Sequence, residues 1–273
     1  MDDQTHILHE KKEKLEAILR RLGRVAVALS AGVDSTFLLK TAHDVLGEGV
    51  LAVTGRMISS PKRETDEAIR FCAETGIRQL VVDVDQMRIE GFADNPPERC
   101  YHCKKALFTA FLDAAAEAGY AHLCEGTNAD DTAQYRPGLR ALRELGVRSP
   151  LMEAGLGKQE IRQLSMQAGL ATWDKPSMAC LATRIPCGDA ITPEKLAVIE
   201  RAEQFLLDHG FRQVRVRMHG NLARIETEPA DIPRIADPKF SQQISRYLHT
   251  LGFRYITLDL DGYSFGSMDH VEI

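Results

Sequence analysis

Residues 24–38 read RVAVALSAGVDSTFL, and this stretch decides the fold. The mainly apolar run Arg24–Leu29 has the length and composition of a buried strand, and Thr36–Leu46 has the apolar spacing of a helix. Between them lies the tight polar turn Ser30–Ser35. A turn that opens a helix offers unpaired N–H groups and a positive dipole end, which attract phosphate. The stretch therefore predicts a strand, a phosphate-binding loop and a helix, in that order.

The side chains of this turn suit a phosphate ligand. Gly32 would let the backbone approach phosphate closely, and Ser30 and Ser35 add hydroxyl donors. The Asp34 carboxylate repels phosphate, so we expect it to act through a bridging Mg²⁺ ion. The alternative is an ordinary strand–turn–helix corner that happens to be rich in small residues.

Strands and helices continue to alternate through the first half of the chain. A helix at residues 6–22 precedes the first strand. Further strands are predicted at Val50–Thr54, Gln79–Val84 and Ala121–Glu125, and further helices at Lys62–Thr75 and Lys104–Ala118. This order is typical of βαβ units and a parallel sheet, which binds ligands where its strands end. We therefore expect the loops Ser30–Ser35, Thr54–Pro61 and Glu125–Asp131 to form the binding site.

The pattern changes near Pro186–Pro193. The segments that follow are a helix, two strands, a helix and a strand, at Pro193–Asp208, Gln213–Met218, Leu222–Thr227, Pro238–Leu251 and Tyr255–Leu260. This order predicts a small α+β domain with an antiparallel sheet. The fold class is therefore α/β, with a parallel-sheet domain at residues 1–188 and a small α+β domain at residues 189–273.

Composition narrows the class of protein. The 273 residues carry 34 Lys plus Arg against 39 Asp plus Glu, a net charge of −5, which argues against a passive nucleic-acid coat. No apolar run reaches the roughly 18 residues of a membrane span, and the polar N-terminus lacks the apolar core of a signal peptide. We expect a cytoplasmic protein with neither a membrane nor a nucleic-acid partner.

Six cysteines are too few for a disulfide scaffold of this size. In a reducing compartment, clustered cysteines such as Cys100-x-x-Cys103 more often indicate metal or redox chemistry. Cysteines outside such clusters usually pack in the core.

The Ser30–Ser35 loop resembles the SGGxDS signature of the PP-loop ATP pyrophosphatases, with Ala31 in place of the first glycine. No GxxxxGK[ST] motif occurs in the chain. Members of that superfamily split ATP between its α- and β-phosphates and adenylate a substrate. The loop Glu125–Asp131 follows a strand and would face the same crevice, so Asp131 is a candidate to share Mg²⁺ with Asp34; the alternative is an Asn/Asp turn that caps a helix. The resemblance implies ATP contacts at Ala28, Ser30, Gly32, Asp34, Ser35, Thr54, Met57 and Gly126.

Further segments resemble one branch of that superfamily, the LarE family of ATP-dependent sacrificial sulfur transferases. They are Arg99–Lys104, Arg136–Arg140, Ser149–Leu151, Lys175–Pro186, Arg215–Gly220 and Asp261–Tyr263. The resemblance implies adenylation of a pyridinium 3,5-dicarboxylate mononucleotide and transfer of sulfur from Cys180, which becomes dehydroalanine. The thiocarboxylate product serves the biosynthesis of the nickel-pincer nucleotide cofactor of lactate racemase. The family also implies a homo-oligomer.

Three arginines are candidates for binding the substrate. Arg215 and Arg217 lie at a period of two, so they share one face of a strand and suit a phosphate or carboxylate. The alternative is a solvent-exposed basic face. Arg184, four residues after Cys180, is a candidate electrostatic partner of its thiolate. Glu200 and Glu203 lie one turn apart on the helix after the linker and are candidates to approach Cys180, but exposure is the commoner fate of glutamate.

Arg224 and Glu226 share a face of the next strand and are candidates to pair with each other.

Several alternatives stay open at this point. Cys180 is either the sulfur donor or a buried structural cysteine. A [4Fe–4S] cluster that carries an exogenous sulfide is a second route, with ligands drawn from Cys100, Cys103, Cys180 and Cys187. Ser264 stands after Gly262-Tyr263 where the family pattern leads us to expect arginine, which weakens the substrate assignment. The other functional classes are a tRNA-thiolating enzyme, an NAD or GMP synthetase-like enzyme and a non-enzymatic nucleotide-binding module.

Overall fold

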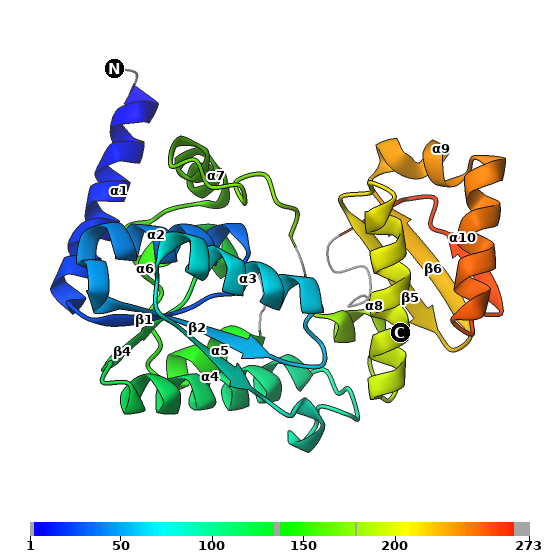
Figure 1. The fold of residues 1–273 in the computed structure, drawn as a ribbon, viewed down its shortest axis with the longest axis horizontal. Coiled ribbons are helices and arrows are strands. Elements are labelled where there is room, and N and C mark those ends of the chain that lie inside the picture. Colours follow the sequence, from blue (N-terminus) through cyan, green and yellow to red (C-terminus); the bar gives the residue numbers. More distant parts are fainter. Residues whose placement is uncertain (1–2, 134–136, 178, 265–273) are drawn as a thin grey trace. The chain divides into compact units, whose positions relative to one another are not determined.

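The computed structural model describes residues 3–133, 137–177 and 179–264 (Figure 1). The chain divides into two compact units. The first comprises Met1–Ile89 and Cys100–Lys175, and the second comprises Glu90–Arg99 and Pro176–Ile273. The domain boundary expected after residue 188 stays a prediction. Among the described residues, no helix combines the length and apolar character needed to cross a membrane.

The first unit is built on a four-stranded parallel sheet in the order β3-β2-β1-β4. Its strands are β1 (Val25–Ala28), β2 (Val50–Arg56), β3 (Gln79–Asp83) and β4 (His122–Cys124). In the register of the sheet, Val25 lies opposite both Val50 and His122. The predicted parallel sheet is therefore confirmed, with strand ends that lie within two residues of the predicted ones.

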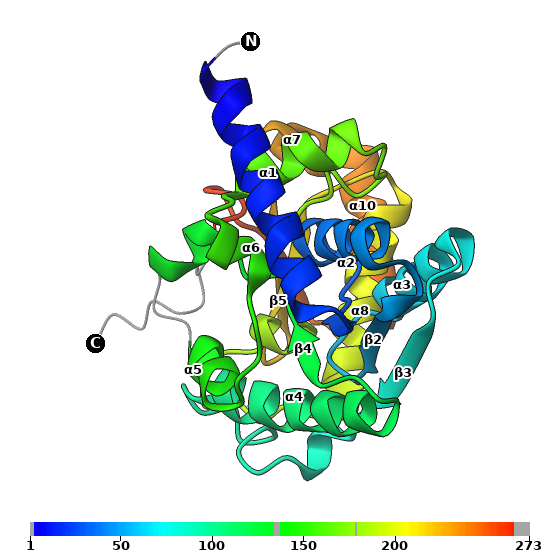
Figure 2. The same ribbon diagram turned by 90° about the vertical axis from the view of Figure 1, so that its left-hand side faces the viewer.

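Helices cover both faces of this sheet (Figures 1 and 2). They are α1 (Asp3–Leu22), α2 (Val33–Leu46), α3 (Lys62–Thr75), α4 (Arg99–Glu117), α5 (Pro137–Glu144), α6 (Pro150–Ala154) and α7 (Lys158–Gln167). Because side chains alternate along a strand, Val25 and Val27 pack in one core with α1, α2, α3, α6 and α7. Ala26 and Ala28 face the opposite core, which α4 and α5 cover. Both faces are buried, as expected for a parallel sheet.

The strand order brings two predicted loops together. The chain runs from β1 to β2 and β3 on one side, and β4 then returns to the other side of β1. Ligands of open α/β sheets bind at such a reversal, beyond the carboxyl ends of the strands. The loops after β1 and β4, Ser30–Ser35 and Glu125–Asp131, lie at this position.

The second unit contains a three-stranded sheet in the order β5-β6-β7. Its strands are β5 (Val214–His219), β6 (Leu222–Thr227) and β7 (Tyr255–Leu258). The expected all-antiparallel sheet is wrong: β5 and β6 form an antiparallel hairpin, but β7 pairs with β6 in parallel. The connection from β6 to β7 passes through α9 (Ile232–Ile235) and α10 (Pro238–Thr250). That crossover is long enough to return the chain to the starting end of β6.

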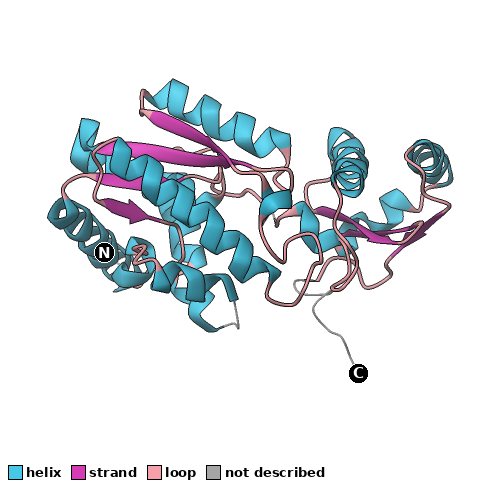
Figure 3. Cartoon of the chain, turned by 90° about the horizontal axis from the view of Figure 1, so that it is seen from below, coloured by secondary structure: helices cyan, strands magenta, loops and turns pink. Residues whose placement is uncertain are grey.

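The long helices of the second unit, α8 (Pro193–Asp208) and α10, lie on one face of its sheet (Figure 3).

The helices α5, α6 and α7 of the first unit were not predicted, and two of them are shorter than ten residues. The segment α2 begins at Val33 rather than at the predicted Thr36. The last residues of the polar turn are therefore the first turn of the helix. Arg136 and Met178, two residues of the family motifs, lie outside the described part of the chain.

Candidate functional site

The loop predicted to bind phosphate connects β1 to α2, so the predicted order of strand, loop and helix is confirmed, and its binding of phosphate stays a prediction. Gly32 precedes the first helical residue, so the N–H groups of Val33, Asp34 and Ser35 belong to the first turn of α2. Ala31 has φ of 55°, a left-handed conformation that glycine adopts freely. Alanine keeps this conformation at a cost of about 1 kcal/mol. The chain therefore retains the loop geometry at the position where the SGGxDS signature has glycine.

Hydroxyl groups fix the loop from inside. The Ser35 hydroxyl accepts from the Ser30 backbone N–H at 3.2 Å and lies 3.0 Å from the Ser30 hydroxyl. The Thr54 hydroxyl donates to the Leu29 carbonyl at 3.1 Å and accepts from Gln79 at 2.9 Å. Thr54 thus secures the residue that leads into the loop, and its contact with ATP stays a prediction.

The two remaining ATP-binding candidates lie at strand ends. Ala28 is buried in the last position of β1, and Met57 is half-buried directly after β2.

Asp34 is held by a lysine of another helix. The Lys158 ammonium, at the start of α7, lies 2.6 Å from Asp34 Oδ2. Burial raises the pKa of Asp34 above its ordinary value; the charge and hydrogen bond of Lys158 offset part of that rise, and the nearby Asp131 carboxylate adds to it. Asp34 is therefore a carboxylate whose charge needs a cationic partner.

The carboxylates present fit a magnesium ion. Asp34 Oδ1 is buried and has no hydrogen-bond partner among the described residues. The second carboxylate, Asp131, is near enough to raise the pKa of Asp34. Its Oδ2 also accepts from the Asn128 N–H at 3.1 Å, so the side chain has a fixed direction. Mg²⁺ is commonly bound by one or two carboxylates together with substrate phosphates. The assignment of Mg²⁺ to Asp34 and Asp131 stays a prediction.

Gly126 brings the loop after β4 against the phosphate-binding loop. A Cβ atom at Gly126 would lie 2.9 Å from the Ser35 nitrogen and 3.2 Å from the carbonyl carbon of Asp34. Both neighbours are backbone atoms, which cannot swing away as a flexible side chain would. Glycine is therefore required by this close approach.

We expect Gly126→Ala to lower ATP affinity at least about tenfold and to destabilise the protein by about 1–3 kcal/mol, because the added methyl displaces the first turn of α2. Isothermal calorimetry with ATP and thermal unfolding measure the two effects. The control is Gly76→Ala, at a left-handed glycine with open space around its Cβ position at the end of α3. It should lower stability and leave ATP affinity intact. Equal loss of affinity in both variants would contradict the prediction.

A second lysine contacts the loop, and the sequence pattern indicated a role for neither lysine. The Lys175 ammonium donates to the Ala31 carbonyl at 2.9 Å and to Glu67 at 2.5 Å. Arg162 donates to the Lys175 carbonyl at 2.8 Å and so fixes that backbone. Lys158 and Lys175 are 124 and 144 residues from their loop partners, so no local pattern could have paired them. Lys175 is the first residue of a segment that resembles the LarE family. That resemblance was the one feature of the sequence that could have indicated a role for Lys175.

Cys180 lies in the second unit, where its side chain is exposed. It immediately precedes the short 3₁₀ helix Leu181–Arg184. Its carbonyl accepts from the Thr183 N–H at 3.0 Å and from the Thr183 hydroxyl at 2.8 Å. The alternative of a buried structural cysteine is therefore wrong, and the thiol is presented on a closed turn.

The three candidate arginines donate to backbone carbonyls around this turn. Arg184 donates to the carbonyls of Ala179 and Cys180, at 2.8 and 3.0 Å. Arg215 donates to the Ser177 carbonyl at 2.5 Å, and Arg217 donates to the Thr183 carbonyl at 3.0 Å. All three side chains are buried. The alternative of a solvent-exposed basic face is therefore wrong, and contact of these arginines with substrate stays a prediction.

Glu203 neutralises the buried Arg184, and the expectation that Glu203 is exposed is wrong. It is 1% exposed, and its carboxylate accepts two hydrogen bonds from Arg184 at 2.8 and 2.9 Å. It also accepts from the Val216 N–H at 2.9 Å. Burial raises the pKa of Glu203, but Arg184, Arg215 and this N–H outweigh burial and hold it below its ordinary value. Helix position alone could not show this, because the partner arginine lies outside the helix.

Burial and the charge of Arg184 lower the pKa of Arg215 to about 10, so Arg215 is still protonated at neutral pH. A second ion pair joins Arg217 to Glu226 at 2.8 Å. Arg224 also contacts Glu226, at 3.0 Å, which confirms the predicted pairing on that strand.

The remaining cysteines fall into two groups. Cys72 and Cys124 are buried, and burial raises their pKa values to about 11 and about 12, so they are core thiols. Cys100 and Cys187 are exposed, and Cys103 accepts from the buried Gln86 side chain at 3.1 Å. Within the described residues, no three His, Cys, Asp or Glu side chains are grouped to hold a metal ion. The [4Fe–4S] cluster stays a prediction.

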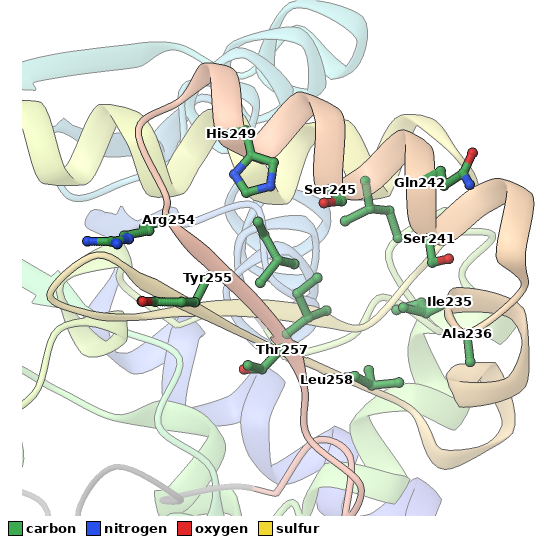
Figure 4. Close-up of a pocket in the computed structure, with 13 residues that line it drawn as sticks. Ile235, Ala236, Ser241, Gln242, Ser245, His249, Arg254, Tyr255, Thr257 and Leu258 are labelled. Atoms are coloured by element: carbon green, nitrogen blue, oxygen red, sulfur yellow. The ribbon is translucent and has the colours of Figure 1, made fainter.

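A groove of about 580 Å³ lies between α10 and β7 in the second unit (Figure 4). His249 and Ser245 of α10 and Tyr255 and Thr257 of β7 lie along it. None of the candidate site residues is among those that line it. Its position therefore adds nothing to the predicted site.

Comparison with known proteins gives relatives over nearly the whole chain. The chain is 40% identical over 265 residues to an uncharacterized protein of Synechocystis sp., a match that covers 97% of this chain and 99% of the relative. It is 39% identical over 264 residues to the pyridinium-3,5-bisthiocarboxylic acid mononucleotide synthase of Lactiplantibacillus plantarum, covering 96% and 95% of the two chains.

A more distant match, 32% identical over 205 residues, is to a component of the glutamine-hydrolyzing GMP synthase of Thermoplasma acidophilum, covering 68% of this chain and 64% of the relative. No protein-family model matches the chain. The match to the Lactiplantibacillus plantarum synthase agrees with the segments that suggested the family, and the chain belongs to the LarE family of PP-loop proteins.

Proposed function

We propose that this protein is an ATP-dependent sulfur transferase that converts carboxylates of pyridinium-3,5-dicarboxylic acid mononucleotide into thiocarboxylates. The observation that carries the proposal is the 39% identity to the Lactiplantibacillus plantarum synthase across nearly the full length of both chains. The product in that relative's name carries two thiocarboxylates, so we infer two rounds of sulfur transfer, each of which consumes the Cys180 sulfur of a separate protein molecule. The product serves biosynthesis of the nickel-pincer nucleotide cofactor.

The proposed chemistry runs in three steps. A substrate carboxylate attacks the α-phosphorus of ATP, which forms an acyl adenylate and releases pyrophosphate. The Cys180 thiolate then attacks the acyl carbon, so a thioester forms and AMP leaves. Finally a base removes the Cα proton of Cys180 and its Cβ–S bond breaks. The sulfur leaves as the product thiocarboxylate, and residue 180 becomes dehydroalanine.

The first unit would bind and activate ATP. The N–H groups in the first turn of α2, with Ser30 and Ser35, suit the phosphates. Asp34 and Asp131 would hold Mg²⁺, which supplies positive charge to neutralise the triphosphate and its pyrophosphate leaving group. In this arrangement Lys158, now 2.6 Å from Asp34, balances the carboxylate before the metal and nucleotide bind.

The Cys180 turn would supply the sulfur. Its thiol is exposed while the carbonyls around it are bonded to buried arginines, so the backbone is held and the sulfur is accessible. Holding a nucleophile in one geometry lowers the entropic part of the barrier to attack. We further propose that the enzyme is a cytoplasmic homo-oligomer that acts on this small nucleotide. A [4Fe–4S] cluster that carries sulfide is the alternative route.

The test is incubation of the purified protein with ATP, Mg²⁺ and the pyridinium dicarboxylate nucleotide under anaerobic conditions. We expect pyrophosphate, AMP and a thiocarboxylate product, measured by chromatography and mass spectrometry. Pyrophosphate release that depends on the nucleotide but gives no thiolated product would mean that the adenylation step is right and the sulfur-transfer step is wrong. Absence of both would refute the ATP-dependent chemistry.

Asp34→Asn gives the matched variant for the first step. We expect pyrophosphate release to fall about 100-fold or more, because the metal loses its carboxylate ligand. ATP binding without Mg²⁺ should persist or tighten slightly, since a negative charge beside the phosphates is gone. The control is Asp44→Asn, which changes an exposed carboxylate on the same helix. Unchanged pyrophosphate release in Asp34→Asn would exclude the metal role of Asp34.

A further inference from the structure

The segment Glu90–Arg99 is part of the second unit, although first-unit residues precede and follow it in sequence. Backbone hydrogen bonds attach it to the chain after Cys180. The Gly188 N–H donates to the Asn95 carbonyl at 2.9 Å, and the Ile191 N–H donates to the Ala93 carbonyl at 2.8 Å. This segment, called here the 90–99 strap, thus lies against residues 182–191.

The Asn95 side chain is the centre of this contact. It is 1% exposed, and its Nδ2 lies 3.3, 2.6 and 3.2 Å from the carbonyl oxygens of Ile185, Pro186 and Asp189. Its backbone has φ of 53°, which asparagine adopts more readily than most residues. One side chain therefore gathers three carbonyls that belong to no regular element.

Arg99 extends the contact toward Cys180. Its Nη1 donates to Asn95 Oδ1 at 2.5 Å and to the Ala182 carbonyl at 3.1 Å. Ala182 lies in the short 3₁₀ helix that begins after Cys180. The strap thus fixes the chain that follows Cys180, whereas Arg184 and Arg215 bond to carbonyls at and before Cys180.

We propose that Asn95 and Arg99 are positioning residues for Cys180, which hold its turn in the geometry required for attack on the adenylated substrate. The inference rests on the proposed function. Irregular backbone has many accessible conformations. A turn that side-chain donors hold on both sides is already ordered, so it loses less conformational entropy on reaching the reactive geometry than an unrestrained turn would. Neither residue takes part in the adenylation step, which the proposal assigns to first-unit residues.

The test uses full-length Asn95→Gly, because glycine keeps the positive φ and the backbone carbonyl while deleting the side chain. We expect the single-turnover rate of sulfur loss from Cys180 to fall about 10- to 100-fold, with pyrophosphate release and the KM for the nucleotide substrate within about twofold of the wild type. Hydrogen–deuterium exchange over residues 181–189 should become faster. The matched control is Asn221→Gly, at an exposed turn in the same unit.

A conservative pair separates positioning from general stability. Arg99→Lys keeps the charge and part of the reach, so it should recover part of the sulfur-transfer rate that Arg99→Ala loses. If Asn95→Gly or Arg99→Ala slows adenylation as much as sulfur transfer, the proposal is overturned. It is also overturned if hydrogen–deuterium exchange over residues 181–189 is unchanged in Asn95→Gly. If the wild-type protein transfers no sulfur, the proposed function fails, and the exchange result alone then decides whether the strap holds the turn.

Discussion

Cys180→Ser should abolish sulfur transfer, by about 10⁴-fold or more, while ATP- and substrate-dependent pyrophosphate release stays within about threefold of the wild type. Serine has no sulfur to give, and its hydroxyl is a far weaker nucleophile than a thiolate at neutral pH. The phosphate-binding loop and its lysines belong to the first unit, so the adenylation machinery is not altered by the change. Intact-protein mass spectrometry of the wild type should show loss of H₂S from residue 180.

The control for this result is Cys187→Ser, which changes another exposed cysteine seven positions later in the same unit. Its thiol donates to the Asn95 carbonyl at 3.4 Å, so the variant loses one weak hydrogen bond. We expect it to transfer sulfur. If both variants fail and the protein contains iron, the cluster route replaces the sacrificial one. If Cys180→Ser still forms thiolated product, an external sulfur donor is used.

The ammonia-dependent alternative is decided by the same variant. A synthetase that passes its adenylated substrate to ammonia, as the similarity to a GMP synthase component would permit, needs no nucleophilic thiol. Cys180→Ser would then leave an amide-forming activity intact. An exposed cysteine on a turn that buried arginines hold is difficult to explain in such an enzyme, because nothing in that reaction uses it.

The parts of the fold that the sequence predicted are those determined by local pattern. The strand β1, the loop and α2 follow from apolar spacing and a polar turn within fifteen residues. The helix Lys62–Thr75 and the strand Leu222–Thr227 match their predicted bounds. The direction of β7 could not be predicted, because strand pairing is set by how α9 and α10 return the chain rather than by the strand itself.

In the candidate site too, the residues that a local pattern indicates were predicted, and those that depend on distant partners were not. The loop that contains Gly126 was predicted from its place after a strand, and Gly126 lies close to Ser35 of the other predicted loop, while its contact with ATP stays a prediction. Lys158 and Asn95 act through partners 124 and about 90 residues away in sequence, and no periodicity records such contacts. Glu203 was misplaced for a further reason: a glutamate on a helix is usually solvated, and only a buried arginine makes its burial favourable.

Glu203→Ala should destabilise the protein by about 3–5 kcal/mol, because it leaves the fully buried Arg184 guanidinium without its counter-charge. That is a large share of the roughly 5–15 kcal/mol that stabilises a typical domain. Urea unfolding measures the loss, and Arg201→Ala, at an exposed position of the same helix, is the control. Replacing both partners, as Arg184→Met with Glu203→Leu, should recover part of the stability, since the Arg184 charge is then removed along with its partner, although the buried Arg215 still loses the nearby Glu203 carboxylate.

The pH dependence of stability tests the same ion pair independently. The pKa of Glu203 in the folded protein lies below its ordinary value of 4.5, so the pair stabilises the fold above that pH and the stabilisation is lost as pH falls through the folded pKa. Other carboxylates also titrate there, but Glu203→Gln removes this one alone. The stability difference between wild type and Glu203→Gln should therefore be constant from about pH 6 to 8 and shrink below about pH 4.5. A difference that is independent of pH would mean that Glu203 contributes through packing and not through its charge.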